Sequence, residues 1–268
     1  MRKYIIKKAK QNWKDNFEIQ LNNSQKKLNP VISKYYFAEY SKVYKPFISN
    51  GAIPDLSDVF KSDEVFKIYK KIFVDVGLKF AFWYSNSFDK LLKRNDVSNH
   101  APIWTSRFET IATRKAKANA GGVIDTAKKT IIKVLRRKLA DKKFMALGEV
   151  EASKILRKEL KGYSNWQSKR LIRTESHFAA NFGALEAAKD MFDKENLVKQ
   201  WMHSGASNER DWHREADGLI VGIDQTFNIG GEDLQFAGDG SGFNAINCRC
   251  ASPSFPREDI DFVNTGEI

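Results

Sequence analysis

Two cysteines near the C-terminus offer the clearest chemistry in the chain. Cys248 and Cys250 are separated by one residue, and the small strained ring that they would close disfavours a disulfide between them. Two thiolates at this spacing could instead bind one soft metal ion, with the imidazole of His213 as a third ligand. A fourth ligand could come from His203, Asp217 or water. A structural Zn²⁺ would then stabilise a C-terminal region of about 60 residues whose core is thin.

The same residues allow other interpretations. Cys248 and Cys250 could be two small buried thiols in a strand, with His213 hydrogen-bonded in a turn. As catalytic groups, His213, Asp217 and a cysteine could act as base, orienting group and nucleophile. A divalent-metal nuclease site could use acidic and histidine side chains of the same stretch. Its candidate ligands are His203, Asp211, His213, Glu215 and Asp217.

In the first three quarters of the chain, apolar residues recur at spacings of three and four with charges between them, as in amphipathic helices. Breaks in this series are expected at Gly121–Gly122 and at Gly162, because glycine is a poor helix former. Ser164 with Gln167 three residues later matches a capping box, which predicts a new helix start. Residues 1–55 are interpreted as a basic arm or as loosely packed helices. Helices are predicted over residues 57–94, 103–120, 123–144, 149–160 and 164–192.

The C-terminal quarter has a different character. Nine of the 16 glycines follow residue 200, helical periodicity disappears, and short β-type runs are separated by glycine-rich turns. The chain is therefore predicted to be α+β, with a mostly helical basic N-terminal region followed by a small turn-rich β or α+β domain. The predicted boundaries are 1–55 for the arm, 56–163 for the helical basic region, 164–258 for the C-terminal domain and 259–268 for a tail.

Charge is distributed unevenly along the chain. There are 45 Lys and Arg against 33 Asp and Glu, a net charge of +12, with +22 in residues 1–173 and −10 in residues 174–268. Clustered cations attract polyanions and release their counterions, so the first block predicts binding to double-stranded DNA without reading its sequence. The candidate DNA-binding residues lie between the apolar positions of one predicted helix. They are Lys128, Lys129, Lys133, Arg136, Arg137, Lys138, Lys142 and Lys143.

Composition argues against several other classes of protein. Two cysteines exclude a disulfide scaffold and fit a reducing compartment. The N-terminus lacks the run of about 7–15 apolar residues that a signal peptide needs. No uncharged apolar run approaches the ~20 residues of a membrane span, and the basic block lacks a clean apolar face opposite its lysines, so no membrane partner is expected.

Three segments resemble the phage head-morphogenesis family, the minor head proteins similar to the F protein of phage Mu. The segments are RLIRTESHFAANFGALEAAKD, KQWMHSGASNERDWHREADGLIVGIDQTF and INCRCASP, within roughly residues 165–255. The family pattern has a helix with Arg-Thr-Glu, then a Trp, an Arg-x-x-His or Cys-x-x-Cys pair, an Asp-Gly turn and a closing Asn-Cys-Arg-Cys. The matching residues are Arg173, Thr174, Glu175, Trp201, Arg210, His213, Asp217, Gly218, Asn247, Cys248, Arg249 and Cys250.

Members of this family that look like zinc binders have the Cys-x-x-Cys pair and a His-Pro before the closing motif. This chain has Arg210 and His213 at the first place and Ala245-Ile246 at the second.

The resemblance implies a minor head (capsid) protein of a tailed phage or prophage, without catalytic activity. Such a virion component associates with the portal protein inside the head, contacts capsid or scaffold proteins, and assists head assembly, genome packaging or DNA ejection. It is found in the virion and, during assembly, in the host cytoplasm. The basic block would then contact DNA while the acidic block docks on protein. The alternative is a toxin or nuclease-type enzyme, because the same C-terminal module also occurs joined to toxin domains.

Overall fold

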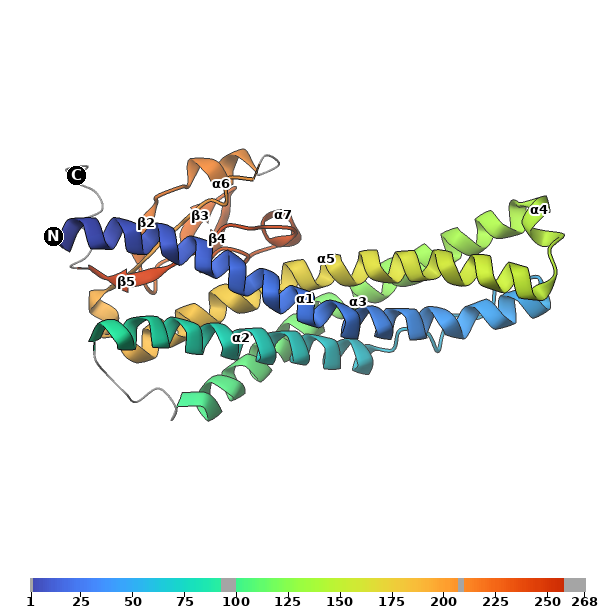
Figure 1. The fold of residues 1–268 in the computed structure, drawn as a ribbon, viewed down its shortest axis with the longest axis horizontal. Coiled ribbons are helices and arrows are strands. Elements are labelled where there is room, and N and C mark those ends of the chain that lie inside the picture. The colour runs from blue at the N-terminus through green and yellow to red at the C-terminus, as the bar shows by residue number, and fades with distance from the viewer. Residues whose placement is uncertain (1, 93–99, 207–209, 258–268) are drawn as a thin grey trace. The chain divides into compact units, whose positions relative to one another are not determined.

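The computed structural model describes residues 2–92, 100–206 and 210–257, with side chains from residue 13 onward except for those of 88–92. The tail predicted over residues 259–268 lies outside the described residues. Long helices precede a small region with two antiparallel sheets, so the predicted α+β class is confirmed (Figure 1). None of the described helices combines the length and the apolar character that a membrane span requires. The helices are α1 (Arg2–Asn50), α2 (Ser62–Leu92), α3 (Ala101–Ala140), α4 (Lys142–Met145), α5 (Glu149–Met191), α6 (Asp211–Glu215) and α7 (Gly242–Ala245).

The two glycine breaks predicted from the sequence are wrong. Gly121–Gly122 lie inside α3, and Gly162 lies inside α5. Each glycine costs a helix only about 1 kcal/mol, which burial of an apolar face on either side of it can offset. Ser164 does not cap a new helix, because its hydroxyl donates to the carbonyl of Lys161 one turn earlier over 2.9 Å. The helices predicted on either side of each glycine break therefore join into the long helices α3 and α5.

The N-terminal residues predicted as an arm or as loosely packed helices form α1, whose described side chains are well packed. Pro30 and Pro46 both lie inside this helix. Near its start, the buried ring of Phe17 meets the ring of Phe80 edge-on, with 4.9 Å between centroids. Further along, Ile32 is also buried. The structure therefore has one long helix with packed side chains where the sequence left an arm or loosely packed helices open.

The chain divides into two compact units, and the division falls within α1, α2, α3 and α5. For this reason neither unit is a continuous segment, and the division does not follow the predicted boundaries at residues 55 and 163. Unit 2 contains 26 Lys and Arg against 10 Asp and Glu, a net charge of +16, whereas unit 1 has a net charge of −4. Unit 1 is Met1–Ser24, Ile72–Glu109 and Arg173–Ile268, and unit 2 is Gln25–Lys71 and Thr110–Ile172.

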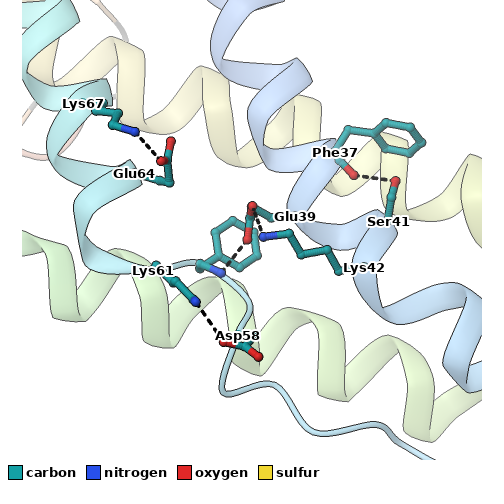
Figure 2. A network of polar contacts seen from close by, with 9 residues as sticks. Phe37, Glu39, Ser41, Lys42, Asp58, Lys61, Glu64 and Lys67 are labelled. Carbon is teal, nitrogen blue, oxygen red and sulfur yellow. Dashed lines mark hydrogen bonds and ion pairs between the residues drawn. The ribbon is translucent and has the colours of Figure 1, made fainter.

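In unit 2, a buried carboxylate holds the connection between α1 and α2. Glu39, which is 5% exposed, accepts hydrogen bonds from the backbone N–H of Phe60 over 2.7 Å and from the Lys42 ammonium over 2.6 Å (Figure 2). Phe60 has a φ of +57°, which is uncommon for a residue with a side chain. Its ring packs against those of Tyr36 and Tyr40. The carboxylate and the aromatic cluster together stabilise this strained residue.

In unit 1, the C-terminal region forms two small sheets. Strand order is β2-β1-β5 in the first sheet and β3-β4 in the second, and every pairing is antiparallel. The region has a small apolar core that includes Trp201, Phe227, Leu234 and both cysteines. The strands are β1 (Leu197–Gln200), β2 (Ile220–Gly222), β3 (Phe227–Ile229), β4 (Glu232–Leu234) and β5 (Ser254–Pro256).

Also in unit 1, α2 and α5 approach closely at a pair of glycines. A Cβ atom on Gly183 would overlap the carbonyl oxygen of Gly77. A Cβ on Gly77 would in turn lie 2.9 Å from the ring of Phe108 of α3. Because neither position bears a side chain, α2 and α5 can approach each other closely here.

Candidate metal centre

Three buried side chains of unit 1 converge on one point. His213 lies on α6, and Cys248 and Cys250 lie on the segment that follows α7. Their ligand atoms are all within 4.8 Å of one another, and the side chains are 1%, 3% and 0% exposed. Nδ1 of His213 is 3.8 Å from Sγ of Cys248 and 3.6 Å from Sγ of Cys250. The structure thus brings together the three ligands predicted from the sequence, and this group could hold a metal ion such as zinc.

Hydrogen bonds around Asn244 determine which nitrogen of His213 faces the thiols. The side-chain amide of Asn244 donates to the carbonyl of Ile229 over 3.1 Å and to Oε2 of Glu232 over 2.9 Å. Its Oδ1 must therefore be the atom that accepts from Nε1 of Trp212, over 2.8 Å, and from Nε2 of His213, over 3.0 Å. A proton on Nε2 leaves a lone pair on Nδ1, directed at the two sulfurs. This is the tautomer that a metal ligand needs.

The thiol of Cys248 is poised to ionise. The hydrogen bond from Cys250 lowers the pKa of the Cys248 thiol well below its usual range, against the opposing effect of burial. A metal binds the thiolate and displaces the proton, so a lowered pKa favours binding at neutral pH.

Helix α5 holds the cysteine segment from the other side. Nε2 of His177 lies 2.5 Å from the carbonyl oxygen of Cys250, which requires the proton on Nε2. One turn later, Oδ1 of Asn181 accepts from the backbone N–H of Ser252 over 2.9 Å. Nδ1 of His177 is buried with no partner among the described residues. These contacts restrain the backbone on which Cys250 is carried.

Most other residues of the family-like motif do not face the thiols. Several of them form hydrogen bonds that hold the backbone around the site. Trp201 donates from Nε1 to the carbonyl of His213 over 3.2 Å, and Arg210 donates to the carbonyl of Ile246 over 2.9 Å. Gly218, with a φ of +83°, donates its N–H to the carbonyl of Trp201. Asn247 has a φ of +58°.

Near the start of the unit 1 portion of α5, the motif residues lie in different surroundings. Thr174 accepts from the backbone N–H of Asn247 through Oγ1 over 3.5 Å, and Glu175 is buried. Arg173 and Arg249 are exposed. The motif therefore combines ligands, positioning contacts and surface residues.

The two suggested protein ligands for a fourth position are not part of the group. Oδ1 of Asp217 instead accepts from the backbone N–H of His203 over 2.8 Å. The nuclease set is not assembled either, since Asp211 is exposed and pairs with Arg214 at 3.4 Å. Glu215 is exposed as well.

A catalytic arrangement of the cysteines is disfavoured by burial. Asn244, and not Asp217, orients His213, so the order of contacts is Cys–His–Asn, as in one class of cysteine proteases. A nucleophile of that class must reach a substrate, whereas these sulfurs and the imidazole are closed off from solvent. Burial of all three ligand side chains therefore favours a structural role for a metal at this site.

Two residues of the site were missed by sequence reasoning. Asn244 lies just before the closing motif and His177 lies within the family-like segment of the Arg-Thr-Glu helix, but neither matches a motif position. Only the contacts between α5, α7 and the cysteine segment reveal their roles.

The predicted DNA-binding residues belong to unit 2 and differ in their surroundings. Lys129, Lys133 and Arg136 are exposed on α3 at spacings of four and three residues, which places them on one face. Arg137 and Lys138 instead form ion pairs with Glu159 of α5. The remaining members are Lys128, which is half-buried on α3, and Lys142 and Lys143, which are exposed on α4.

No protein-family model, curated protein or solved structure matches the chain. The resemblance to phage head-morphogenesis proteins therefore depends on the motif residues themselves.

Proposed function

We propose that the chain is a minor head protein of a tailed phage or prophage, associated with the portal inside the head. In this role it binds packaged DNA without sequence preference and assists head assembly, genome packaging or ejection, without catalysing a reaction. One observation supports this assignment above others: the separate segments of the family-like motif meet around one buried group. His177 of α5 and His213 of α6 both contact Cys250.

The charge of the two units supports a division of work between DNA and protein partners. Unit 2 carries +16 and exposes the row Lys129, Lys133 and Arg136 on α3. Such a row suits the phosphates of duplex DNA, which carry no sequence information. Unit 1, with a net charge of −4, would be repelled by DNA and suits docking on portal, capsid or scaffold protein.

We also propose that the buried group binds Zn²⁺ as a structural ion. Two thiolates and one imidazole match the ligand preference of zinc, and water or a further group would complete the tetrahedron. The ion would crosslink α6 to the cysteine segment in a region with a small apolar core. When bound, it supplies a structural link and takes part in no reaction.

The assignment as a head protein is tested with particles of the phage that encodes the chain. We expect mass spectrometry of density-purified particles to find the protein in few copies, and the tagged full-length chain to copurify with the portal protein of the same genome. Deletion of its gene should reduce the yield of infectious, DNA-filled heads. Absence from the particles, together with full infectivity of the deletion, would rule the assignment out.

Duplex binding is tested by a salt titration of the full-length chain. We expect the triple variant Lys129→Gln/Lys133→Gln/Arg136→Gln to flatten the slope of log affinity against log salt by about 2–3 units, since each lost phosphate contact accounts for about 0.9. The matched control removes three exposed cations of unit 1, Lys194→Gln/Arg214→Gln/Arg249→Gln, and should leave the slope unchanged. Equal slopes for both variants would mean that α3 is not the duplex contact.

A further inference from the structure

A hollow of about 640 Å³ lies within unit 2, between α1 and the first turns of α5. Phe37 and Tyr44 of α1 line one side of it. The other side comes from α5, which contributes Glu149, Val150 and Ser153 and four cations, Lys154, Arg157, Lys158 and Lys161. The hollow shares no residue with the exposed row on α3.

The four cations of the hollow outnumber the one carboxylate that lines it, that of Glu149. Their positions follow the spacing i, i+3, i+4, i+7, which places them on one face of α5. Among the described residues, Lys154 forms one ion pair, at 3.8 Å with the exposed Glu151. Lys158 and Lys161 have no ion pair with any residue in the described part of the chain. Glu159, the neighbour of Lys158 in the sequence, pairs with cations of α3. With four cations against Glu149, this face carries a net positive charge.

Two half-buried aromatic rings complete the hollow. Phe37 and Tyr44 are seven residues apart on α1, which places them on the same face about 10 Å from each other. The guanidinium of Arg157 lies over the ring of Phe37, 5.7 Å from its centroid. The hollow therefore combines positive charge with two planar groups. One is the ring of Tyr44, and the other is the ring of Phe37 with the Arg157 guanidinium over it.

We propose that this hollow binds a single-stranded segment of nucleic acid. Its phosphates would contact the lysines of α5, and its bases would stack on Tyr44 and on the Arg157–Phe37 pair. Positive grooves with aromatic platforms are the usual means of holding single strands, because every unpaired base offers a planar face. In a duplex these faces are hidden in the base stack, so a duplex would meet only the lysines at the rim. This activity goes beyond the duplex binding proposed above and does not depend on the role in a phage head.

The test compares three probes by fluorescence anisotropy with the full-length chain. They are a thymidine 20-mer, an abasic 20-mer with the same phosphates, and a 20-base-pair duplex. We expect the thymidine strand to bind about tenfold or more tightly than the abasic strand, because stacking adds to the phosphate contacts. The variant Phe37→Leu/Tyr44→Leu should lower thymidine affinity to the abasic level without changing duplex affinity. Phe37→Tyr, which keeps the aromatic ring, should retain the wild-type affinity for the thymidine strand.

Charge variants separate this site from the duplex contact on α3. Lys154→Gln/Lys158→Gln/Lys161→Gln should weaken both single strands and flatten their salt slope by about 2 units, at about 0.7 per phosphate. These lysines are solvent-facing, so folding should be preserved, as circular dichroism would verify. The matched triple variant of Lys129, Lys133 and Arg136 should leave single-strand affinity unchanged.

Three outcomes would overturn the proposal. The first is equal affinity for the thymidine and abasic strands. The second is an equal loss of single-strand affinity from the two triple variants. The third is that Lys154→Gln/Lys158→Gln/Lys161→Gln weakens binding of the duplex alone. If the duplex alone binds, the single-strand site fails while the proposed duplex binding stands. If no probe binds at about 50 mM salt, both fail, and the head assignment is still decided by the particle experiment.

Discussion

The Nε2–H of His213 donates to Oδ1 of Asn244 over 3.0 Å, and this bond turns the unprotonated Nδ1 toward two sulfur atoms. Asn244 has no freedom to reverse its amide, because its Nδ2 donates to Glu232 and to the carbonyl of Ile229. A residue that touches neither thiol therefore prepares the imidazole for a metal.

Replacing Asn244 with leucine should loosen the metal centre. The variant keeps a similar volume but leaves Nε1 of Trp212 and Nε2 of His213 without their acceptor, so we expect zinc affinity to fall 10–100-fold and stability by about 2 kcal/mol. Competition with a chromophoric chelator measures the affinity, and urea denaturation the stability. The control Asn228→Ala changes an exposed asparagine and should behave as wild type. Unchanged zinc affinity in Asn244→Leu would show that this amide does not orient a ligand.

Removal of the metal should destabilise the protein. With free zinc at a thousand times its Kd, we expect a stabilisation of about 4 kcal/mol that a strong chelator abolishes. Elemental analysis should find one zinc per chain in wild type and in His203→Gln, whose imidazole lies outside the group, but none in Cys250→Ser. If wild type contains no zinc and melts at the same temperature with chelator, Cys248 and Cys250 are simply buried thiols.

Glycine-to-alanine substitutions should have opposite effects in two helices. At Gly183 a methyl group would collide with the backbone of Gly77, and we expect a loss of about 1–3 kcal/mol. At Gly121 the added methyl would meet no atom within 4 Å beyond its chain neighbours and its own helix backbone, so the higher helix propensity of alanine should stabilise α3 by up to about 1 kcal/mol. Urea denaturation of both variants measures the difference. A neutral Gly183→Ala would mean that α2 and α5 can move apart without cost.

Lys199 should make stability depend on pH in the alkaline range. Its side chain is fully buried in β1, with Nζ 3.1 Å from Oε1 of Gln235. Burial, reinforced by the charge of Lys189, lowers the pKa of Lys199 from 10.5 to about 8. Between these values the unfolded chain binds more protons than the folded one, so the free energy of unfolding should rise as pH increases from 8 to 10.5.

The variant Lys199→Met isolates this effect. It removes the buried charge, and we expect it to exceed wild type in stability by about 1 kcal/mol at pH 7, with the gap closing toward pH 10. Urea denaturation at pH 7, 8, 9 and 10 measures the gap. The control Lys194→Met alters an exposed lysine and should show no such trend. A gap that is constant with pH would mean that Lys199 keeps its proton throughout.

The ligands of the metal centre could be predicted because their residue types are rare in this chain. Cys248 and Cys250 are its only cysteines, and His213 is one of four histidines, so their spacing was informative by itself. The change from helical periodicity to glycine-rich turns likewise predicted the α+β class. These features are local, so they can be seen in the sequence without knowing which distant residues come into contact.

The remaining features depend on contacts between distant residues. The roles of Asn244 and His177 exist only where α7 and α5 meet the cysteine segment. The glycines of α3 and α5 were expected to end helices, but packing along both helices outweighs their low propensity. The two units mix distant segments because each long helix contributes to both, which no boundary drawn along the sequence can express.

Asn247 has a left-handed backbone, with φ of +58°, immediately before Cys248. Asparagine and glycine adopt this conformation at least cost, whereas β-branched residues resist it. Its side chain is exposed, so we infer that the asparagine of the Asn-Cys-Arg-Cys motif is needed for its backbone conformation and not for the chemistry of its side chain. A search pattern for proteins with this centre should therefore accept glycine at that place, demand the two cysteines and the histidine, and add the distant asparagine of α7.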